Sequence, residues 1–243
     1  MKLCIIFFYL SSYFLFFSIF ATKKPTTMTL EMKNGGFGIG EDLLFNRLNF
    51  FVRQGETVCV QGYSAQACTS LLRCLLGFEA LTEGFISIDG SVLTAASAAT
   101  FRRMMSYVPR QLALPYATMG QAAEALLDLK VNAKQTFSTN QLLAEWQLLG
   151  LPQALLDKAP AELTPTQQYR AALAMATLLR KDIVLADAPA TRPDSAVAQL
   201  IDQYLHALAR RGVAVVAVSA DDVFAHSCNR IVRLDDASFG MEV

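Results

Sequence analysis

Short apolar runs alternate with longer helical segments along most of this chain, and this order constrains the fold more than any other feature. The run at 182–186 is continuously apolar, as expected of a parallel strand that is buried on both faces. Strand-like runs also lie at 56–61 and 213–219, and helical spacing marks 66–76, 167–179 and 194–210. Such β-α-β-α alternation predicts a parallel sheet with helices on both sides.

Other segments predict additions to that sheet. Residues 37–55 contain two strand-like stretches around a turn rich in glycine, and an alternating strand at 85–90 ends in a turn. Shorter strands are predicted at 106–108 and 230–234. Residues of about 117–160 are rich in Ala, Leu and Gln and have no β runs, which predicts a helical insert. Residues 28–243 are therefore expected to form one domain, and Gly77 is expected to end the helix at 66–76.

Composition narrows the functional class. The chain has 243 residues, of which 53% are apolar and 17% charged, so it can bury a large core. Its 21 basic and 21 acidic residues balance, which argues against a nucleic-acid partner or a polybasic membrane patch. The 5 cysteines include no C-x-x-C pair and the 2 histidines are far apart in sequence, so no tightly bound transition metal is expected. This cysteine usage fits a reduced, cytosolic compartment.

The first 27 residues do not match the rest. The stretch from Cys4 to Phe20 is nearly all apolar and is followed by Lys23 and Lys24, at the short limit for a membrane span. Three interpretations remain open: a mis-assigned start with Met28 as the initiator, a real membrane anchor, or a cleaved signal sequence.

The strand at 56–61 leads into a loop and a helix, which is the context of a phosphate-binding loop. Such a loop, G-x-x-x-x-G-K-[ST], wraps phosphates with backbone N–H groups, pairs a lysine with their charge and holds magnesium with a hydroxyl. Here Gly62 fills the first position, but Ala67 replaces the second glycine and Cys68 replaces the lysine. The candidate nucleotide-binding residues of this segment are Gly62, Ser64, Ala67, Cys68, Thr69 and Ser70.

Further motifs follow in an order that resembles the ABC transporter ATPase family over residues of about 30–236. The stretch 79–90 is similar to the segment that follows the P-loop helix, and 107–111 resembles the Q-loop, with Arg110 on the usual glutamine position and Gln111 one residue later. A stretch similar to the signature L-S-G-G-Q consists of Leu163, Thr164, Pro165, Thr166 and Gln167.

The C-terminal motifs continue the same resemblance. Residues 183–191 resemble the Walker B segment, with Asp187 as its aspartate and Ala188 where the family has a catalytic glutamate. Asp194 falls on the D-loop aspartate, and Ala220 stands at the switch histidine. The resemblance implies an α/β fold: a P-loop NTPase-type parallel sheet with an antiparallel β edge and a helical insert subdomain, the ABC cassette.

The departures from the family pattern all weaken nucleotide binding or hydrolysis. Ala188 cannot orient the attacking water, and Ala220 cannot contact a γ-phosphate, so no catalytic residue is intact. Cys68 removes a charge-assisted hydrogen bond worth about 1.5–3 kcal/mol of nucleotide binding. Pro165 lacks an N–H group and stiffens a loop that must approach the ligand. Since phosphoryl transfer depends on positioning and charge, hydrolysis is not expected.

The resemblance also implies ligands and partners. Thr69 and Asp187 are the candidate magnesium residues, and together with Ser70 and Gln167 they predict at most weak contact with ATP and magnesium. A transmembrane permease subunit would be docked through the groove near residues 109–130, at the inner face of the membrane, and a second ABC cassette is left open as a partner. The interpretation is a binding or scaffold subunit; an active ABC ATPase and a nucleotide-independent regulatory protein remain as alternatives.

Overall fold

The computed structural model describes residues 28–62, 64–129, 132, 138–188 and 194–234. The apolar leader at 1–27 and the end of the Walker B-like stretch, 189–191, lie outside the described residues. The strands are β1 (Thr29–Ile39), β2 (Asp42–Arg53), β3 (Thr57–Gln61), β4 (Glu83–Ile88), β5 (Ser91–Val92), β6 (Met105–Val108), β7 (Ile183–Ala186), β8 (Ala214–Val218) and β9 (Arg230–Arg233). The helices are α2 (Ala65–Leu75), α3 (Ala98–Met104), α4 (Met119–Leu127), α5 (Thr139–Leu148), α6 (Pro165–Leu178), α7 (Ser195–Arg210) and α8 (Asp222–Ser227), with short 3-10 turns η2 (Gln153–Asp157) and η3 (Pro160–Glu162).

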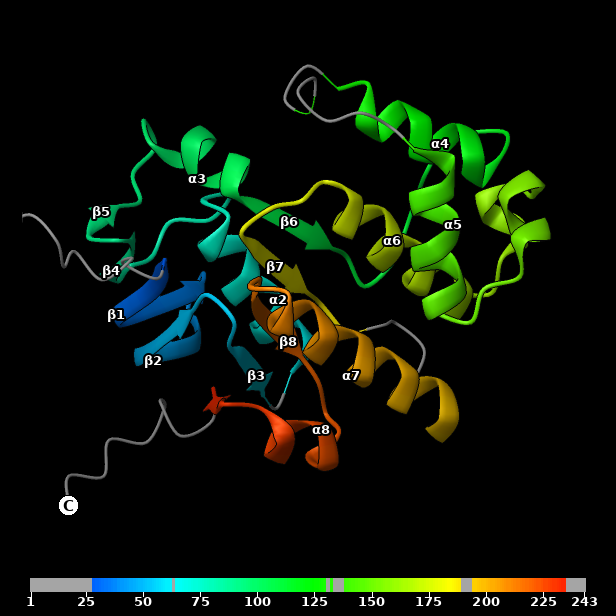
Figure 1. The fold of residues 1–243 in the computed structure, drawn as a ribbon. Coiled ribbons are helices and arrows are strands. Elements are labelled where there is room, and N and C mark those ends of the chain that lie inside the picture. The colour runs from blue at the N-terminus through cyan, green and yellow to red at the C-terminus, as the bar shows by residue number, and fades with distance from the viewer. Residues whose placement is uncertain (1–27, 63, 130–131, 133–137, 189–193, 235–243) are drawn as a thin grey trace, which may run out of the picture.

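The described strands form a parallel sheet and a separate antiparallel sheet, as the sequence predicts (Figure 1). The parallel sheet has the order β6-β7-β8-β3-β9, and the antiparallel sheet has the order β2-β1-β4-β5. Strand β7 is buried at every residue, which confirms the inference drawn from its uninterrupted apolar run. Parallel neighbours bring their carboxyl ends to one edge: Val108 at the end of β6 pairs with Ala186 at the end of β7.

The parallel sheet separates two apolar cores, because successive side chains of a strand point to opposite faces. One core contains alternate residues such as Val58 and Val60 of β3, together with α2 and the antiparallel sheet. The other contains Cys59 of the same strand, together with α6, α7, α8 and the helical insert. The apolar residues of these strands are thus divided between the two cores, and a shift of register by one residue would exchange the two sets.

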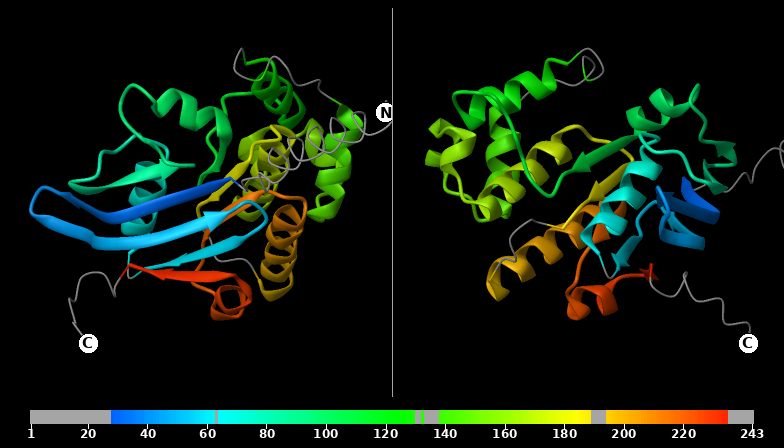
Figure 2. Two further views of the ribbon diagram at one scale, coloured as in Figure 1. Left: turned by 60° about the vertical axis from the view of Figure 1, so that its left-hand side comes forward. Right: turned by 180° about the vertical axis from the view of Figure 1, so that it is seen from behind.

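The helical insert is confirmed and lies at the end of the molecule opposite the β1–β2 hairpin (Figures 1 and 2). The buried Trp146 of α5 donates its indole N–H to the Pro152 carbonyl at 3.0 Å, which closes the chain after the helix. Arg170 of α6 is 9% exposed and donates to the carbonyls of Leu149 and Gly150 at 2.9 and 3.3 Å. The last turn of α5 is thus held against α6 by a buried guanidinium.

Two boundaries differ from the sequence prediction. The glycine-rich turn predicted between the two strands is confirmed at Gly40, but Gly35, Gly36 and Gly38 belong to β1, with register shifts against β2. Strand β1 needs glycine at position 38, since a Cβ there would lie 2.8 Å from the Asp42 carbonyl of the neighbouring strand. Gly77, with a φ of +68°, ends α2 as predicted.

The second difference concerns the helix predicted at 167–179, which begins two residues earlier. Pro165 is the first helical residue of α6 rather than part of a loop. A proline tolerates this position because its missing N–H has no partner there in a helix, and its fixed φ suits the first turn. None of the helices in the described part of the chain has the length and apolar character to cross a membrane.

We expect Arg170→Met to lower the free energy of unfolding by about 2 kcal/mol, because the buried Leu149 carbonyl and the neighbouring Gly150 carbonyl lose a charged donor. Urea unfolding followed by circular dichroism measures the change. The matched control is Arg210→Met at an exposed position of α7, where a change within about 0.5 kcal/mol is expected. Equal losses in the two variants would contradict the anchoring role of Arg170.

Candidate functional site

The loop after β3 leads directly into α2, and this junction forms one wall of the candidate site. Ser64 caps the helix, since its hydroxyl accepts a hydrogen bond from the Ala67 N–H at 3.0 Å. One first-turn N–H that a phosphate could use is therefore already satisfied within the chain. Ala67 is fully buried and Ser70 is 4% exposed, so both side chains pack behind the wall and do not line the cavity.

Cys68 occupies the lysine position without reaching into solvent. Its side chain is 3% exposed and packs in the core around α2. A Cβ placed on Gly62 would lie 3.0 Å from the Cys68 sulfur, so the thiol lies close against the loop backbone. This burial fits a packing residue better than a reactive thiol, which needs an accessible and electropositive setting.

Thr69 and Asp187, expected to act together, are brought into contact by the structure. The Thr69 hydroxyl donates to Oδ2 of Asp187 at 2.6 Å, and the Ala188 N–H donates to Oδ1 at 2.9 Å. The Asp187 side chain has no exposed surface. Burial raises its pKa, while the Thr69 hydroxyl, the nearby Arg110 charge and the Ala188 N–H favour the ionised form.

Arg110 is the unexpected member of this group. Its guanidinium Nη1 lies 3.9 Å from Oδ1 of Asp187, and its side chain is 32% exposed. Nearby Tyr107 has a pKa raised to about 12, first by burial and then by the Asp187 charge. Gln111, the predicted glutamine contact, is exposed and does not line the cavity at this site.

The magnesium ion that the resemblance implies has suitable ligand types at this site, but their surroundings do not suit a cation. Hydroxyl and carboxylate oxygens are the ligands that it prefers, and Thr69 and Asp187 supply both kinds side by side. However, both carboxylate oxygens already accept hydrogen bonds, and a guanidinium lies close to one of them. As the side chains stand, the position of the metal charge is already held by Arg110, so the donor set does not fit a resident metal ion. The described residues also contain no cluster of three or more His, Cys, Asp or Glu that could hold a metal.

The signature-like residues are engaged within their own helix. The Thr164 hydroxyl caps α6 by accepting from the Gln167 N–H at 3.3 Å, and the Gln167 side-chain oxygen accepts from the Thr164 N–H at 2.9 Å. Leu163 is 4% exposed and packs in the second core. The Thr166 carbonyl accepts a hydrogen bond from the Arg170 Nε–H at 3.4 Å. The structure does not bring this segment to the cavity beside Gly62.

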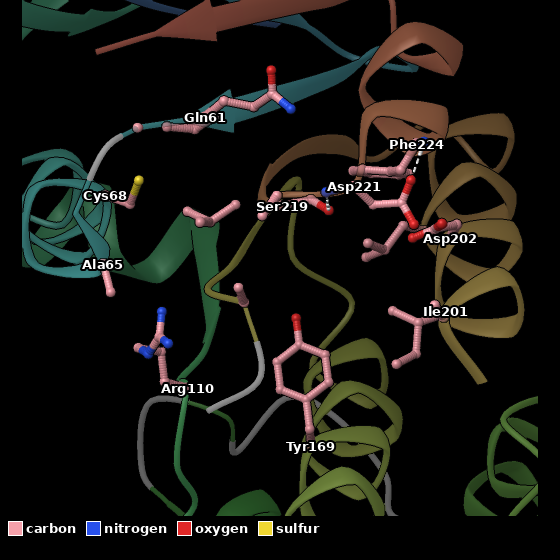
Figure 3. A pocket seen from close by; sticks show the side chains of 17 residues that line it. Gln61, Ala65, Cys68, Arg110, Tyr169, Ile201, Asp202, Ser219, Asp221 and Phe224 are labelled. Carbon is pink, nitrogen blue, oxygen red and sulfur yellow. Dashed lines mark hydrogen bonds between the residues drawn. The ribbon is translucent and has the colours of Figure 1, made fainter. Parts of the chain in front are cut away.

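A cavity of about 540 Å³ opens beside the loop, between the carboxyl ends of the strands and α7 (Figure 3). Ala188 and Ala220 both line it, so the positions of the family glutamate and histidine present methyl groups to its interior. Cys68 and Arg110 line the wall on the side of α2 (Figure 3), and Gly62 of the loop before α2 also lines the cavity. The volume lies in the range of small-molecule pockets.

The far side of the cavity carries residues that no sequence motif had singled out. Tyr169 of α6 is 3% exposed and points its hydroxyl into the space, and burial raises its pKa (Figure 3). Asp202 of α7 faces Asp221, the cap of α8, and its pKa is raised to about 6 by burial and then by the Asp221 charge. The sequence places Asp202 inside an amphipathic helix, where an aspartate is usually a surface residue. Only the packing of α7 beside β8 shows that Asp202 lines the cavity.

The comparisons with known proteins decide the family. The profile described as "ABC transporter" matches residues 45–191, which is more than half of the chain. This chain belongs to the ABC transporter family. The match begins in β2 and spans the phosphate loop, the insert and the signature-like segment.

Curated relatives agree with this assignment. A Fe(3+) ions import ATP-binding protein of Rhodococcus jostii is 30% identical, over 80% of this chain and 53% of that protein. A similarly named protein of Mesorhizobium japonicum is 29% identical, over 72% of this chain and 49% of that protein. The glutamine transport ATP-binding protein of Bacillus subtilis is 26% identical over 81% of this chain and 83% of that protein. The chain thus spans about half the length of the iron-import relatives it matches.

Solved structures confirm the cassette fold. A dimeric ATP-binding cassette in a post-hydrolysis state with ADP and Pi has a TM-score of 0.72 and 26% identity, covering 84% of this chain and 94% of that one. A bacterial Atm1-family ABC exporter with ATP bound has a TM-score of 0.71 and 20% identity, covering 86% of this chain and 37% of that one. The second likeness concerns the fold alone.

The shifted pKa of Asp202 predicts a pH-dependent stability. The pKa rises from an ordinary 3.8 to about 6, so the folded state binds this proton more tightly than the unfolded chain does. The group therefore favours folding at low pH, and this contribution is lost as the pH rises from about 4 to about 6. We expect Asp202→Asn to stabilise the protein by about 1 kcal/mol at pH 7.5, after allowance for solvent screening, and by nothing measurable at pH 4.

Thermal unfolding at both pH values measures this difference. The control is Asp157→Asn in η2, an exposed position at which no such pH-dependent gain is expected. A gain for Asp202→Asn that is the same at pH 4 and pH 7.5 would show that the carboxylate charge is not its cause.

Proposed function

We propose that this chain is a degenerate ATP-binding cassette subunit of an import transporter, which does not hydrolyse ATP and acts as a docking subunit for a transmembrane permease. The observation that carries the proposal is the pair of methyl groups, Ala188 and Ala220, that line the cavity where the family places its catalytic glutamate and switch histidine. Neither can accept a proton or contact a phosphate. Tyr169 and Asp202 also line the cavity, but neither stands at a family catalytic position.

Loss of the loop lysine acts in the same direction. Cys68 is uncharged and buried, and Ser64 satisfies an N–H of α2 that phosphate would otherwise use. The remaining hydroxyl of Thr69 is bonded to Asp187. In our proposal nucleotide therefore binds weakly at this loop. The folded cassette acts by binding other proteins through its surface and does not turn over ATP.

An apolar groove supports the docking half of the proposal. The segment 112–115 lies opposite Pro160 and Ala161, and together with Gln168 they enclose about 410 Å³. The segment 112–115 falls within the stretch 109–130, which the resemblance assigns to the membrane subunit, and the remaining lining residues come from η3 and α6. Import is proposed from the names of the relatives, which include Fe(3+), glutamine and spermidine/putrescine systems. We place such an import subunit at the inner face of the membrane, with a second ABC cassette as its partner.

Phosphate release from ATP tests the catalytic half. We expect the rate of the purified chain to equal that of its Asp187→Asn variant, with or without the permease, because no group activates the attacking water. Calorimetry on the same samples should give a dissociation constant weaker than about 100 μM for ATP. A rate that falls by tenfold or more in the variant would identify an active ABC ATPase instead.

Co-purification with membranes tests the docking half. We expect Leu114→Asp to abolish recovery of the permease with the tagged chain, because it places a charge in the apolar groove. The matched control is Leu148→Asp on α5, at a side chain that is 49% exposed and outside the groove, which should bind as the wild type does. Recovery of no membrane subunit by the wild-type chain, without ATP binding, would favour the nucleotide-independent regulatory protein.

A further inference from the structure

The register of the parallel sheet places a positive charge beside the buried carboxylate. Strands β6 and β7 are paired in parallel, with Val108 opposite Ala186, and the Asp187 N–H donates to the Val108 carbonyl at 2.9 Å. Arg110, two residues beyond β6, therefore emerges at the same sheet edge as Asp187. Its guanidinium faces the cavity from the side of α2 (Figure 3).

The Asp187 carboxylate is surrounded by donors. Thr69 bonds to one oxygen at 2.6 Å, the Ala188 N–H bonds to the other at 2.9 Å, and Arg110 lies 3.9 Å from that second oxygen. A fully buried carboxylate needs such compensation, because burial without a partner is costly. A divalent cation would share these oxygens with the donors already present and would stand close to a guanidinium, which repels it.

We propose that Arg110 is a built-in counter-ion that takes the place of a divalent metal at Asp187, so that this site receives phosphate groups without a metal. Arg110 is the only cationic side chain among the described residues that line the cavity. Gly62 and Cys68 of the phosphate loop line the same space. A guanidinium presents a planar fork of N–H donors to phosphate oxygens.

The proposal has two separable halves. The metal half depends only on Arg110, Thr69 and Asp187, and it requires no nucleotide. The ligand half rests on the proposed function, since it assumes that the loop still makes weak contact with phosphates. If Arg110 and Asp187 formed only a structural ion pair, replacing Arg110 would destabilise the protein but would not create a binding site for a metal ion.

Thermal unfolding with and without 10 mM MgCl2, at constant ionic strength, tests the metal half on the full chain. We expect the midpoint of the wild type to be unchanged by magnesium. Arg110→Gln should unfold about 2–4 °C lower without magnesium, and should recover about 2 °C or more with it, because the metal then occupies the place of the guanidinium. Arg110→Lys keeps the charge and should remain insensitive to magnesium.

Two controls exclude other causes. Arg103→Gln removes an exposed arginine of α3 and should leave both the midpoint and the magnesium response unchanged. Adding Asp187→Asn to Arg110→Gln should abolish the recovery by magnesium. The proposal is overturned if magnesium stabilises the wild type as much as Arg110→Gln, or if Arg110→Gln is destabilised without any recovery.

Titration with ATP tests the ligand half. We expect the wild type to bind ATP in EDTA at least as tightly as in magnesium, and Arg110→Gln to lose tenfold or more of its affinity in EDTA. Tighter binding of ATP by the wild type in magnesium, or no binding in either buffer, would overturn this half. Neither result depends on hydrolysis or on the permease, so it is distinguishable from a failure of the proposed function.

Discussion

The buried carboxylate of Asp187 is the constraint on which the arrangement of the site depends. It ends β7, accepts from Thr69 of α2, and lies near Arg110 beyond β6, so one side chain joins three elements that are far apart in sequence. A charge with no exposed surface must be compensated by donors in fixed positions. The geometry of the loop and of the sheet edge is therefore coupled through this group, whether or not a ligand is present.

The fold can maintain this arrangement without nucleotide because its cores are complete. Each face of the parallel sheet packs against its own apolar layer, and Arg170 holds the insert to α6 through backbone carbonyls. Ala220 lines the cavity and belongs to neither core, and Ala188 also lines it and adds only a methyl group to the edge of the first core. The stability of the domain and the chemistry of its site are thus separable, and the second can be lost while the first is kept.

Most of the fold followed from the sequence because period and order are local signals. The apolar run at 182–186 predicted a strand buried on both faces, and Gly77 predicted the end of α2. The glycine-rich turn was correct only at Gly40, because close approach of β2, and not a turn, requires glycine at position 38. The surroundings of Asp187 were predicted in part. Thr69 was found by its place in the loop motif, but the direction of Arg110 and the exposure of Asp202 to the cavity depend on sheet register, which no local pattern encodes.

The capping of α6 has a consequence for assembly. Thr164 and Gln167 satisfy each other's backbone N–H groups, and Pro165 has none to offer, so the start of this helix has few donors left for the phosphates of a neighbouring subunit. A dimer formed across this surface would therefore gain little from bonds between this helix and a phosphate, and would depend mainly on protein–protein contacts. Its population would then follow chiefly the concentration of the subunits.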